Sequence, residues 1–199
     1  MPRPRAYDAT DVLDRATALF WRQGYAATSV QELVEATGLN RASMYAAYGD
    51  KHGLFLAALD HYLTQVAAER MAPLEQDGPA LAAIGAFLRG LIEASGSAPR
   101  LGCLLTNSLT ECGPHDLAVA ERLLHSLAQV EAALAATIRR GQAEGSIGAT
   151  DSPEALAGLL LTMAQGLRVL SRGGMSDAAL ERVVDTALAL LRCRLDVLE

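Results

Sequence analysis

The segment Thr28–Lys51, TSVQELVEATGLNRASMYAAYGDK, decides the fold of this chain. Ser29 and Glu32, three residues apart, form a capping box and predict that a helix begins there. Gly38 can adopt the left-handed conformation that ends a helix, and Asn40 is a second N-cap that begins another. Two short helices around a glycine turn predict a helix-turn-helix, whose second helix enters the DNA major groove. An ordinary αα-hairpin is the alternative interpretation of this spacing.

The second of these helices, which we expect to end near Tyr48, has two different faces. Met44 and Tyr48 lie four residues apart, so they share one face, which we assign to the core. The other face carries Arg41, Ser43 and Tyr45. A polar outer face is typical of a helix that enters a DNA groove.

The rest of the chain also has helical periodicity, and no segment shows the period-2 alternation of a β-strand. We therefore predict an all-α protein, with a three-helix DNA-binding head at 1–50 and a larger regulatory and dimerisation domain at 51–199. The first helix is expected to begin after Asp8 or Asp11 and to end near Gln23. Loops are expected at Pro73–Pro79 and Ser95–Pro99, between helices at about Lys51–Met71, Ala80–Ala94, Gly102–Cys112, Asp116–Glu144, Pro153–Arg172 and Ser176–Val197.

The composition indicates a globular protein of the cytoplasm. The 199 residues are 51% hydrophobic, which is enough for a sizeable core. The net charge of −6 lies outside residues 1–52, where six basic residues balance six acidic ones, so the acidity of the chain does not oppose a local DNA-binding surface there. No run of about 18 apolar residues predicts a membrane span, and the N-terminus lacks the apolar core of a secretory signal. Three cysteines without C-x-x-C spacing fit a reducing compartment.

The sequence offers no pattern for catalysis. The four histidines do not have metal-ligand spacing, and neither G-x-S-x-G nor a phosphate-binding loop occurs. We therefore expect no catalytic residues, no metal and no cofactor.

The segment Leu19–Phe55 resembles the DNA-binding head of the TetR family of transcriptional regulators. The resemblance implies a homodimer that binds an inverted-repeat operator, most often as a repressor, and leaves it when a small-molecule effector binds. The matching positions are Gly24-Tyr25, Thr28-Ser29, Gly38-Leu39, Tyr45, Tyr48, and Lys51 ahead of Leu54-Phe55.

The resemblance also implies which residues contact DNA. Arg41 is the strongest candidate because an arginine pairs bidentately with guanine, although a solvated helix charge is its alternative role. Ala46 and Ala47 cannot form hydrogen bonds to bases, so direct readout is expected to be thin. The implied phosphate contacts are Thr28, Ser29, Tyr45 and Lys51, and the candidates at base edges are Asn40, Arg41, Ala42, Ser43 and Ala46.

Arg3 and Arg5 lie in a short arm that contains prolines. Such arms can enter a minor groove, so we include both arginines among the candidate DNA contacts. A solvated tail without a DNA contact is the alternative.

The last two helices carry wide apolar stripes. A partner subunit could cover them in a four-helix bundle, and a helix-turn-helix dimer needs two heads about 34–36 Å apart. An intramolecular core is the alternative interpretation. The expected interface residues are Leu156, Leu160, Met163, Leu167, Leu180, Val184, Ala187 and Leu191.

A pocket for the effector is expected in the middle helices. Only Tyr62 and Phe87 supply aromatic rings after position 56, so the pocket should be mostly aliphatic with a few polar groups. The candidate lining residues are Leu88, Leu91, Leu104, Leu105, Asn107, Ser108, Glu111, His125, Gln129 and Gln165.

Two further hypotheses remain open. A redox-responsive regulator could use Cys103, alone or across a dimer. Cys103 and Cys112 are nine residues apart and face opposite sides of one helix, so a disulfide between them would require the helix to unfold. A helical protein-interaction adaptor would explain the acidic helices but not the helix-turn-helix.

Overall fold

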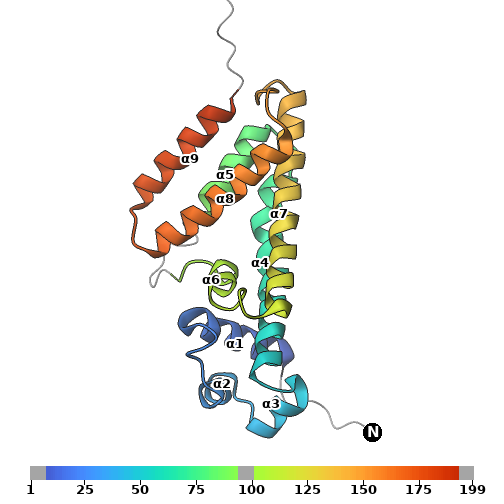
Figure 1. The fold of residues 1–199 in the computed structure, drawn as a ribbon, viewed down its shortest axis with the longest axis vertical. Helices are drawn as coiled ribbons and strands as arrows, with labels where there is room; N and C mark the ends of the chain where they lie inside the picture. The colour runs from blue at the N-terminus through green and yellow to red at the C-terminus, as the bar shows by residue number, and fades with distance from the viewer. Residues whose placement is uncertain (1–7, 94–100, 193–199) are drawn as a thin grey trace, which may run out of the picture. The chain divides into compact units, whose positions relative to one another are not determined.

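The structure is a computed structural model that describes residues 8–93 and 101–192 (Figure 1). Arg3, Arg5 and the expected loop Ser95–Pro99 lie outside the described residues. Within them the chain is helical, as predicted, with one isolated antiparallel bridge between Ile147 and Arg192. The helices are α1 (Ala9–Gln23), α2 (Val30–Thr37), α3 (Arg41–Tyr48), α4 (Lys51–Glu75), α5 (Ala80–Glu93), α6 (Leu104–Glu111), α7 (Leu117–Ala143), α8 (Pro153–Arg172) and α9 (Asp177–Leu191).

Two predicted helix ends are wrong. α4 continues through Pro73 to Glu75 instead of ending near Met71. Leu74 is buried, and its carbonyl accepts the Thr137 hydroxyl at 3.2 Å, so packing outweighs the backbone hydrogen bond that proline cannot donate.

α9 ends at Leu191, not near Val197. Arg192 has an extended backbone with ψ 139°, and the Leu191 carbonyl accepts the N–H of Gly148 at 3.0 Å. The helix therefore ends where the chain forms its bridge to the 147–148 segment.

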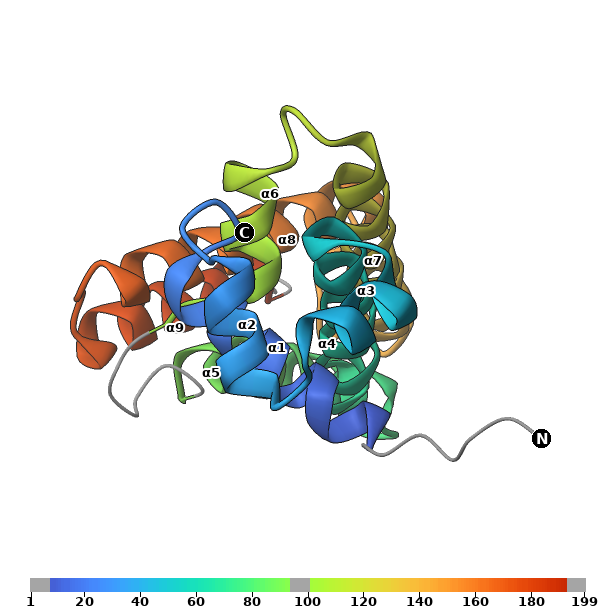
Figure 2. The same ribbon diagram turned by 90° about the horizontal axis from the view of Figure 1, so that it is seen from below.

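The helices form two compact packing units. The first comprises residues 8–66 and 103–123, and the second comprises 67–93, 101–102 and 124–192. α4 and α7 each begin in the first unit and end in the second. The packing division differs from the boundary expected after residue 50, because α6 packs against α1 (Figure 2). The functional domains 1–50 and 51–199 stay a prediction.

The first unit has an aromatic core between α1 and α4. Phe20 and Phe55 meet edge to face with ring centroids 4.9 Å apart, and Tyr25 lies 4.7 Å from Phe55. Leu33 from α2 and Met44 from α3 are fully buried in this unit. Burial of one such side chain contributes about 1.5–3 kcal/mol, so this core fixes α2 and α3 on α1 and α4.

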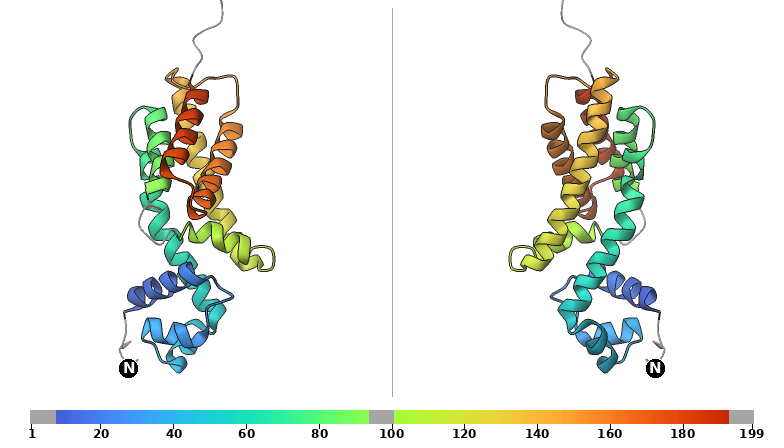
Figure 3. Two further views of the ribbon diagram at one scale, coloured as in Figure 1. Left: turned by 90° about the vertical axis from the view of Figure 1, so that its left-hand side faces the viewer. Right: turned by 90° about the vertical axis from the view of Figure 1, so that its right-hand side faces the viewer.

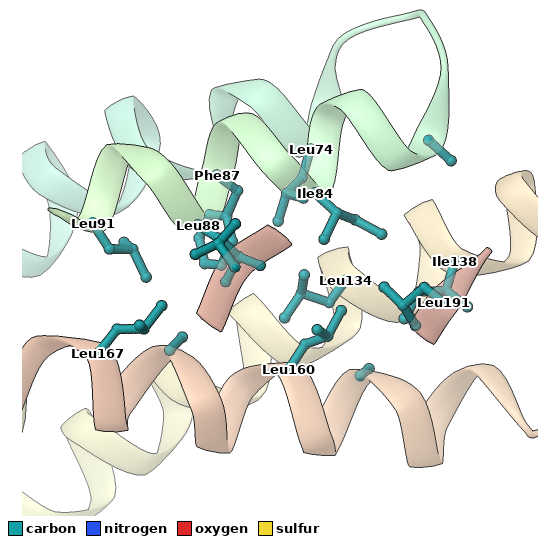
Figure 4. Packing of buried hydrophobic residues seen from close by; sticks show 14 of the residues in the cluster. Leu74, Ile84, Phe87, Leu88, Leu91, Leu134, Ile138, Leu160, Leu167 and Leu191 are labelled. Atoms are coloured by element: carbon teal, nitrogen blue, oxygen red, sulfur yellow. The ribbon is translucent and has the colours of Figure 1, made fainter. Parts of the chain in front are cut away.

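The second unit packs α8 and α9 against α5, together with the later turns of α7 (Figures 3 and 4). Its core includes several residues of the predicted dimer interface. Five of the eight expected interface residues are buried inside this single chain, so they hold the protomer together: Leu160, Leu167, Leu180, Val184 and Leu191. Their burial fits the intramolecular alternative, and the dimer interface itself stays a prediction.

Candidate nucleic-acid interface

The local sequence signals of the helix-turn-helix are confirmed. Ser29 Oγ accepts the Glu32 N–H at 3.2 Å, and the Glu32 carboxylate accepts the Ser29 N–H at 2.8 Å. The hydrogen bond from the Ser29 N–H, followed by the interactions of the carboxylate with the Ser29 and Gln23 side chains, lowers the pKa of Glu32. Gly38 has φ 72° and ends α2, and Asn40 Oδ1 accepts the Ser43 N–H at 2.8 Å to begin α3.

The two faces of α3 are nearly as expected. Met44 is fully buried, whereas Tyr48 is only half-buried, so its assignment to the core is wrong in degree. Tyr48 is the last residue of α3, and Gly49 turns the chain away immediately after it. Among the candidate DNA contacts of this segment Ser43 is half-buried, and the exposed ones are Asn40, Arg41, Ala42, Tyr45 and Ala46.

Thr28 is buried instead of facing outward. Its hydroxyl donates to the Gly24 carbonyl at 2.6 Å, and the residue as a whole is only 1% exposed. This geometry opposes the expected phosphate contact through the Thr28 side chain, which instead closes the α1–α2 loop. Ser29, the next residue, is exposed.

Lys51 at the start of α4 lies against the α1–α2 loop. Its Nζ is 3.5 Å from the Ala26 carbonyl oxygen and 4.4 Å from the centroid of the Tyr25 ring. The ammonium group thus joins the first turn of α4 to the loop before α2. The cap expected at Asp50 is present, since its carboxylate accepts the Gly53 N–H at 2.7 Å.

Gly53 is a structural residue that sequence analysis missed. A Cβ at this position would collide with the carbonyl oxygen of Tyr48, the last residue of α3. The close approach of α3 and α4 therefore requires glycine here. No local signal reveals this need, because it arises from the angle between two helices.

Glu111, one of the expected pocket residues, contacts the loop between α1 and α2. Its carboxylate accepts the N–H groups of Ala26 at 2.8 Å and of Tyr25 at 3.1 Å. No local pattern in the sequence indicates this contact, because it joins positions 85 and 86 residues apart.

A second long-range contact lies nearby. His52 Nε2 is 2.6 Å from Asp116 Oδ2, between the first turn of α4 and the cap of α7. Burial alone would raise the pKa of Asp116, but the Val119 N–H and the His52 ring hold it below its usual value.

The other expected pocket residues are not gathered in one described cavity. Leu88 and Leu91 are buried in the second unit, whereas Leu104, Leu105 and Ser108 are buried in the first and Asn107 is half-buried there. His125 and Gln129 are exposed and contact each other at 3.3 Å, and Gln165 is half-buried. The two surface hollows described in the second unit, of about 300 and 810 Å³, contain none of the ten.

The larger hollow is an apolar groove along α8 and α9. Five of the expected interface residues line it: the partly exposed Leu156, Met163 and Ala187, and at its floor the buried Leu160 and Leu191. Leu159 and Leu190 lie beside them and are largely exposed. The groove is therefore an apolar surface of the second unit to which both α8 and α9 contribute.

The two cysteines in the described part of the chain, Cys103 and Cys112, are buried and are not joined in a disulfide. Cys103 Sγ lies 3.6 Å from the Tyr62 hydroxyl oxygen. Burial, followed by the charges of Glu111 and Asp116, raises the pKa of the Cys112 thiol to about 11. Across the described residues no group of three or more metal-binding side chains occurs, and no helix has the length and apolar character of a membrane span.

Two family models match this chain. The one described as "Bacterial regulatory proteins, tetR family" matches residues 12–58, which include the capped pair α2 and α3. The one described as "Tetracyclin repressor-like, C-terminal domain" matches residues 80–187, from α5 into α9.

Curated relatives extend over nearly the whole chain. The HTH-type transcriptional repressor ComR of Escherichia coli (strain K12) is 33% identical over 190 residues, which are 94% of this chain and 90% of ComR. The uncharacterized HTH-type transcriptional regulator YezE of Bacillus subtilis (strain 168) is 31% identical over 193 residues, 96% of this chain and 100% of YezE.

Solved structures have the same fold. A cysteine mutant of the TetR family transcriptional regulator CifR, complexed with 26bp double-strand operator DNA, matches with a TM-score of 0.83 and 34% identity over 94% of this chain and 98% of CifR. The reduced form of E. coli NemR matches with a TM-score of 0.84 over 94% of this chain and 97% of NemR; at 16% identity it supports the fold alone.

Proposed function

This chain belongs to the TetR family of bacterial regulatory proteins, and we propose that it is a transcriptional repressor that binds one operator sequence and is released by a small-molecule effector. The proposal places its action on DNA in the cytoplasm. The observation that supports it most is the exposed outer face of α3, held in place by caps at both ends and by buried Met44.

Base recognition is assigned to α3. Arg41 is exposed in the first turn, where recognition helices contact base edges, and its guanidinium can donate two hydrogen bonds to one guanine. Asn40 uses its Oδ1 as the cap, which leaves its amide N–H groups for a base. Exposed Ala42 and Ala46 can only contact a thymine methyl group.

Phosphate binding is assigned to the two flanks of α3. Ser29 and Tyr45 are exposed, and Lys51 adds a positive charge at the start of α4. Thr28 is left out because its hydroxyl is used inside the loop. Such contacts set register and affinity on any sequence, whereas the α3 side chains set the preference among sequences.

A homodimer and an inverted-repeat operator follow as parts of the same proposal. One α3 reads only a half-site, and two-fold symmetry supplies the second. The apolar groove of α8 and α9 is the proposed partner surface, through Leu156, Leu159, Met163, Ala187 and Leu190. An effector would act by binding better to a dimer whose head spacing does not fit the operator.

Selection of bound sequences from random duplex DNA tests this function. The wild-type protein should enrich an inverted repeat. Arg41→Ala should lose or relax the preference at one position of each half-site, by about 1–3 kcal/mol.

The matched variant Arg41→Lys keeps the positive charge but cannot form the two-pronged contact. It should retain affinity for unselected DNA better than Arg41→Ala, yet lose the same base preference. Failure of folded wild-type protein to enrich any sequence would overturn the proposal and favour the adaptor hypothesis.

A further inference from the structure

We propose that Glu111, at the end of α6, is a positioning residue for DNA recognition, which it serves by holding the loop between α1 and α2. This inference rests on the proposed function for its DNA readout. All the contacts that carry it lie inside the first packing unit.

The Glu111 carboxylate occupies two consecutive backbone donors. Oε1 accepts the Ala26 N–H at 2.8 Å, and Oε2 accepts the Tyr25 N–H at 3.1 Å. Successive N–H groups after a helix end form a concave site for an anion, and a carboxylate satisfies both donors at once. A neutral amide in its place has only one acceptor oxygen, so it can satisfy one donor fully.

The lack of a side chain at Gly24 leaves space for this carboxylate. Gly24 has φ 84°, and a Cβ there would lie 2.8 Å from Glu111 Oε2. Any other residue at position 24 would therefore strain the backbone and also push the carboxylate away. The absence of a side chain at this turn is what allows Glu111 to reach the two N–H groups.

The held loop leads directly to the proposed phosphate contacts. The backbone of Ala26 is held at two points. Its N–H donates to Glu111, and its carbonyl oxygen lies 3.5 Å from Lys51 Nζ. Lys51 also lies over the Tyr25 ring. Ser29, which caps α2, follows only three residues after Ala26. Loss of the Glu111 contact should therefore loosen both Lys51 and Ser29.

A second contact of the same connection fixes the other side of the head. Asp116, which caps α7 through the Val119 N–H at 3.1 Å, meets His52 in the first turn of α4. The segment from Glu111 to Asp116 thus contacts both the α1–α2 loop and the start of α4. A change at the end of α6 would reach the DNA-binding surface through these two contacts.

The effect is expected on loop order more than on folding. Both Glu111 hydrogen bonds are exposed to solvent, where water competes for the same groups and the gain in overall stability is small. The loop donors themselves lose their only described acceptor when the carboxylate is removed. Their exchange with solvent is therefore the most direct measure of the contact.

The experiment compares Glu111→Gln and Glu111→Ala with Glu121→Ala. Glu121 is an exposed carboxylate on α7, so its removal changes the net charge equally. Amide hydrogen exchange and amide proton shifts of residues 25 and 26 are recorded by NMR on the free protein. Operator affinity is measured for the same variants on the sequence that wild-type protein selects.

We expect faster exchange at residues 25 and 26 in both Glu111 variants, with an upfield move of their amide protons and little change in α3. Glutamine should retain part of the protection of one amide. Operator affinity should fall about tenfold in Glu111→Ala and stay unchanged in Glu121→Ala. Unchanged exchange at both amides, or wild-type operator affinity in Glu111→Ala, would overturn the inference. Wild-type protein that selects no operator would instead refute the proposed function, because the exchange result does not depend on DNA.

Discussion

Replacing Leu190 by glutamate is expected to separate the proposed dimer while each protomer stays folded. Leu190 and Leu159 line the groove of α8 and α9 and are 68% and 64% exposed. Full burial of a leucine contributes about 1.5–3 kcal/mol, so covering two-thirds of each contributes about 1–2 kcal/mol. A two-fold interface contains each residue twice, which brings the pair to about 4–8 kcal/mol of dimerisation. A buried unpaired carboxylate at position 190 would cost more than this gain.

Sedimentation equilibrium measures the monomer–dimer constant of the wild type and of three variants. Leu190→Glu should be monomeric at micromolar concentration with an unchanged helical circular dichroism spectrum. Leu117→Glu is the matched control, because Leu117 is 81% exposed on α7 and does not line the groove. Leu160→Ala removes a side chain that is 1% exposed inside the core, so it should lower the free energy of unfolding by about 2–5 kcal/mol.

Two results would refute this reasoning. One is a Leu190→Glu protein that stays dimeric at the concentrations where the wild type is dimeric. The other is a wild type that is monomeric throughout. Dissociation of Leu117→Glu would move the interface to the beginning of α7.

Three further changes probe single features of the fold. Gly53→Ala should lower the melting temperature strongly, because the new methyl group collides with the Tyr48 carbonyl oxygen. Gly90→Ala has open space around the new methyl group and should raise the free energy of unfolding by about 1 kcal/mol. Thermal unfolding followed by circular dichroism measures both effects. The Cys112 thiol, with its pKa raised to about 11, should be about 0.1% ionised at pH 8 and react far more slowly with iodoacetamide than a free cysteine, as mass spectrometry of the intact protein would detect. Asp116→Asn should destabilise the protein at neutral pH. Burial opposes ionisation of this carboxyl, yet hydrogen bonds hold its pKa in the folded protein below the unfolded value of 3.8. The difference in unfolding free energy between wild type and Asp116→Asn, measured with urea, should therefore vanish as pH falls from 3.8 through the folded pKa. A difference that persists at that pH would contradict the assignment.

The helix-turn-helix could be predicted because its sequence signals are local. The capping box of Ser29 and Glu32, the glycine turn at Gly38 and the cap at Asn40 each act within four residues, so the sequence contains both partners of every interaction. Met44 followed from helical periodicity for the same reason.

The surroundings of the expected pocket and interface residues could not be predicted in this way. A periodic pattern shows that a stripe is apolar but not which element covers it. Leu160 and Leu159 are adjacent in the sequence, yet one is covered by α5 and its neighbours and the other is left open. Polar residues such as His125 and Glu111 likewise showed no local sign of where they would lie.

Sequence alone determined the all-α class, the position of the helix-turn-helix and the identity of its exposed face, since caps, turns and periodicity are properties of neighbouring residues. Tertiary structure decided that Thr28 faces inward, that Pro73 stays helical and that Glu111 holds a loop 85 residues away. Those outcomes depend on contacts between residues far apart in the chain. Burial and the demand for hydrogen-bond partners are settled only when distant helices meet, and local propensity then yields to packing.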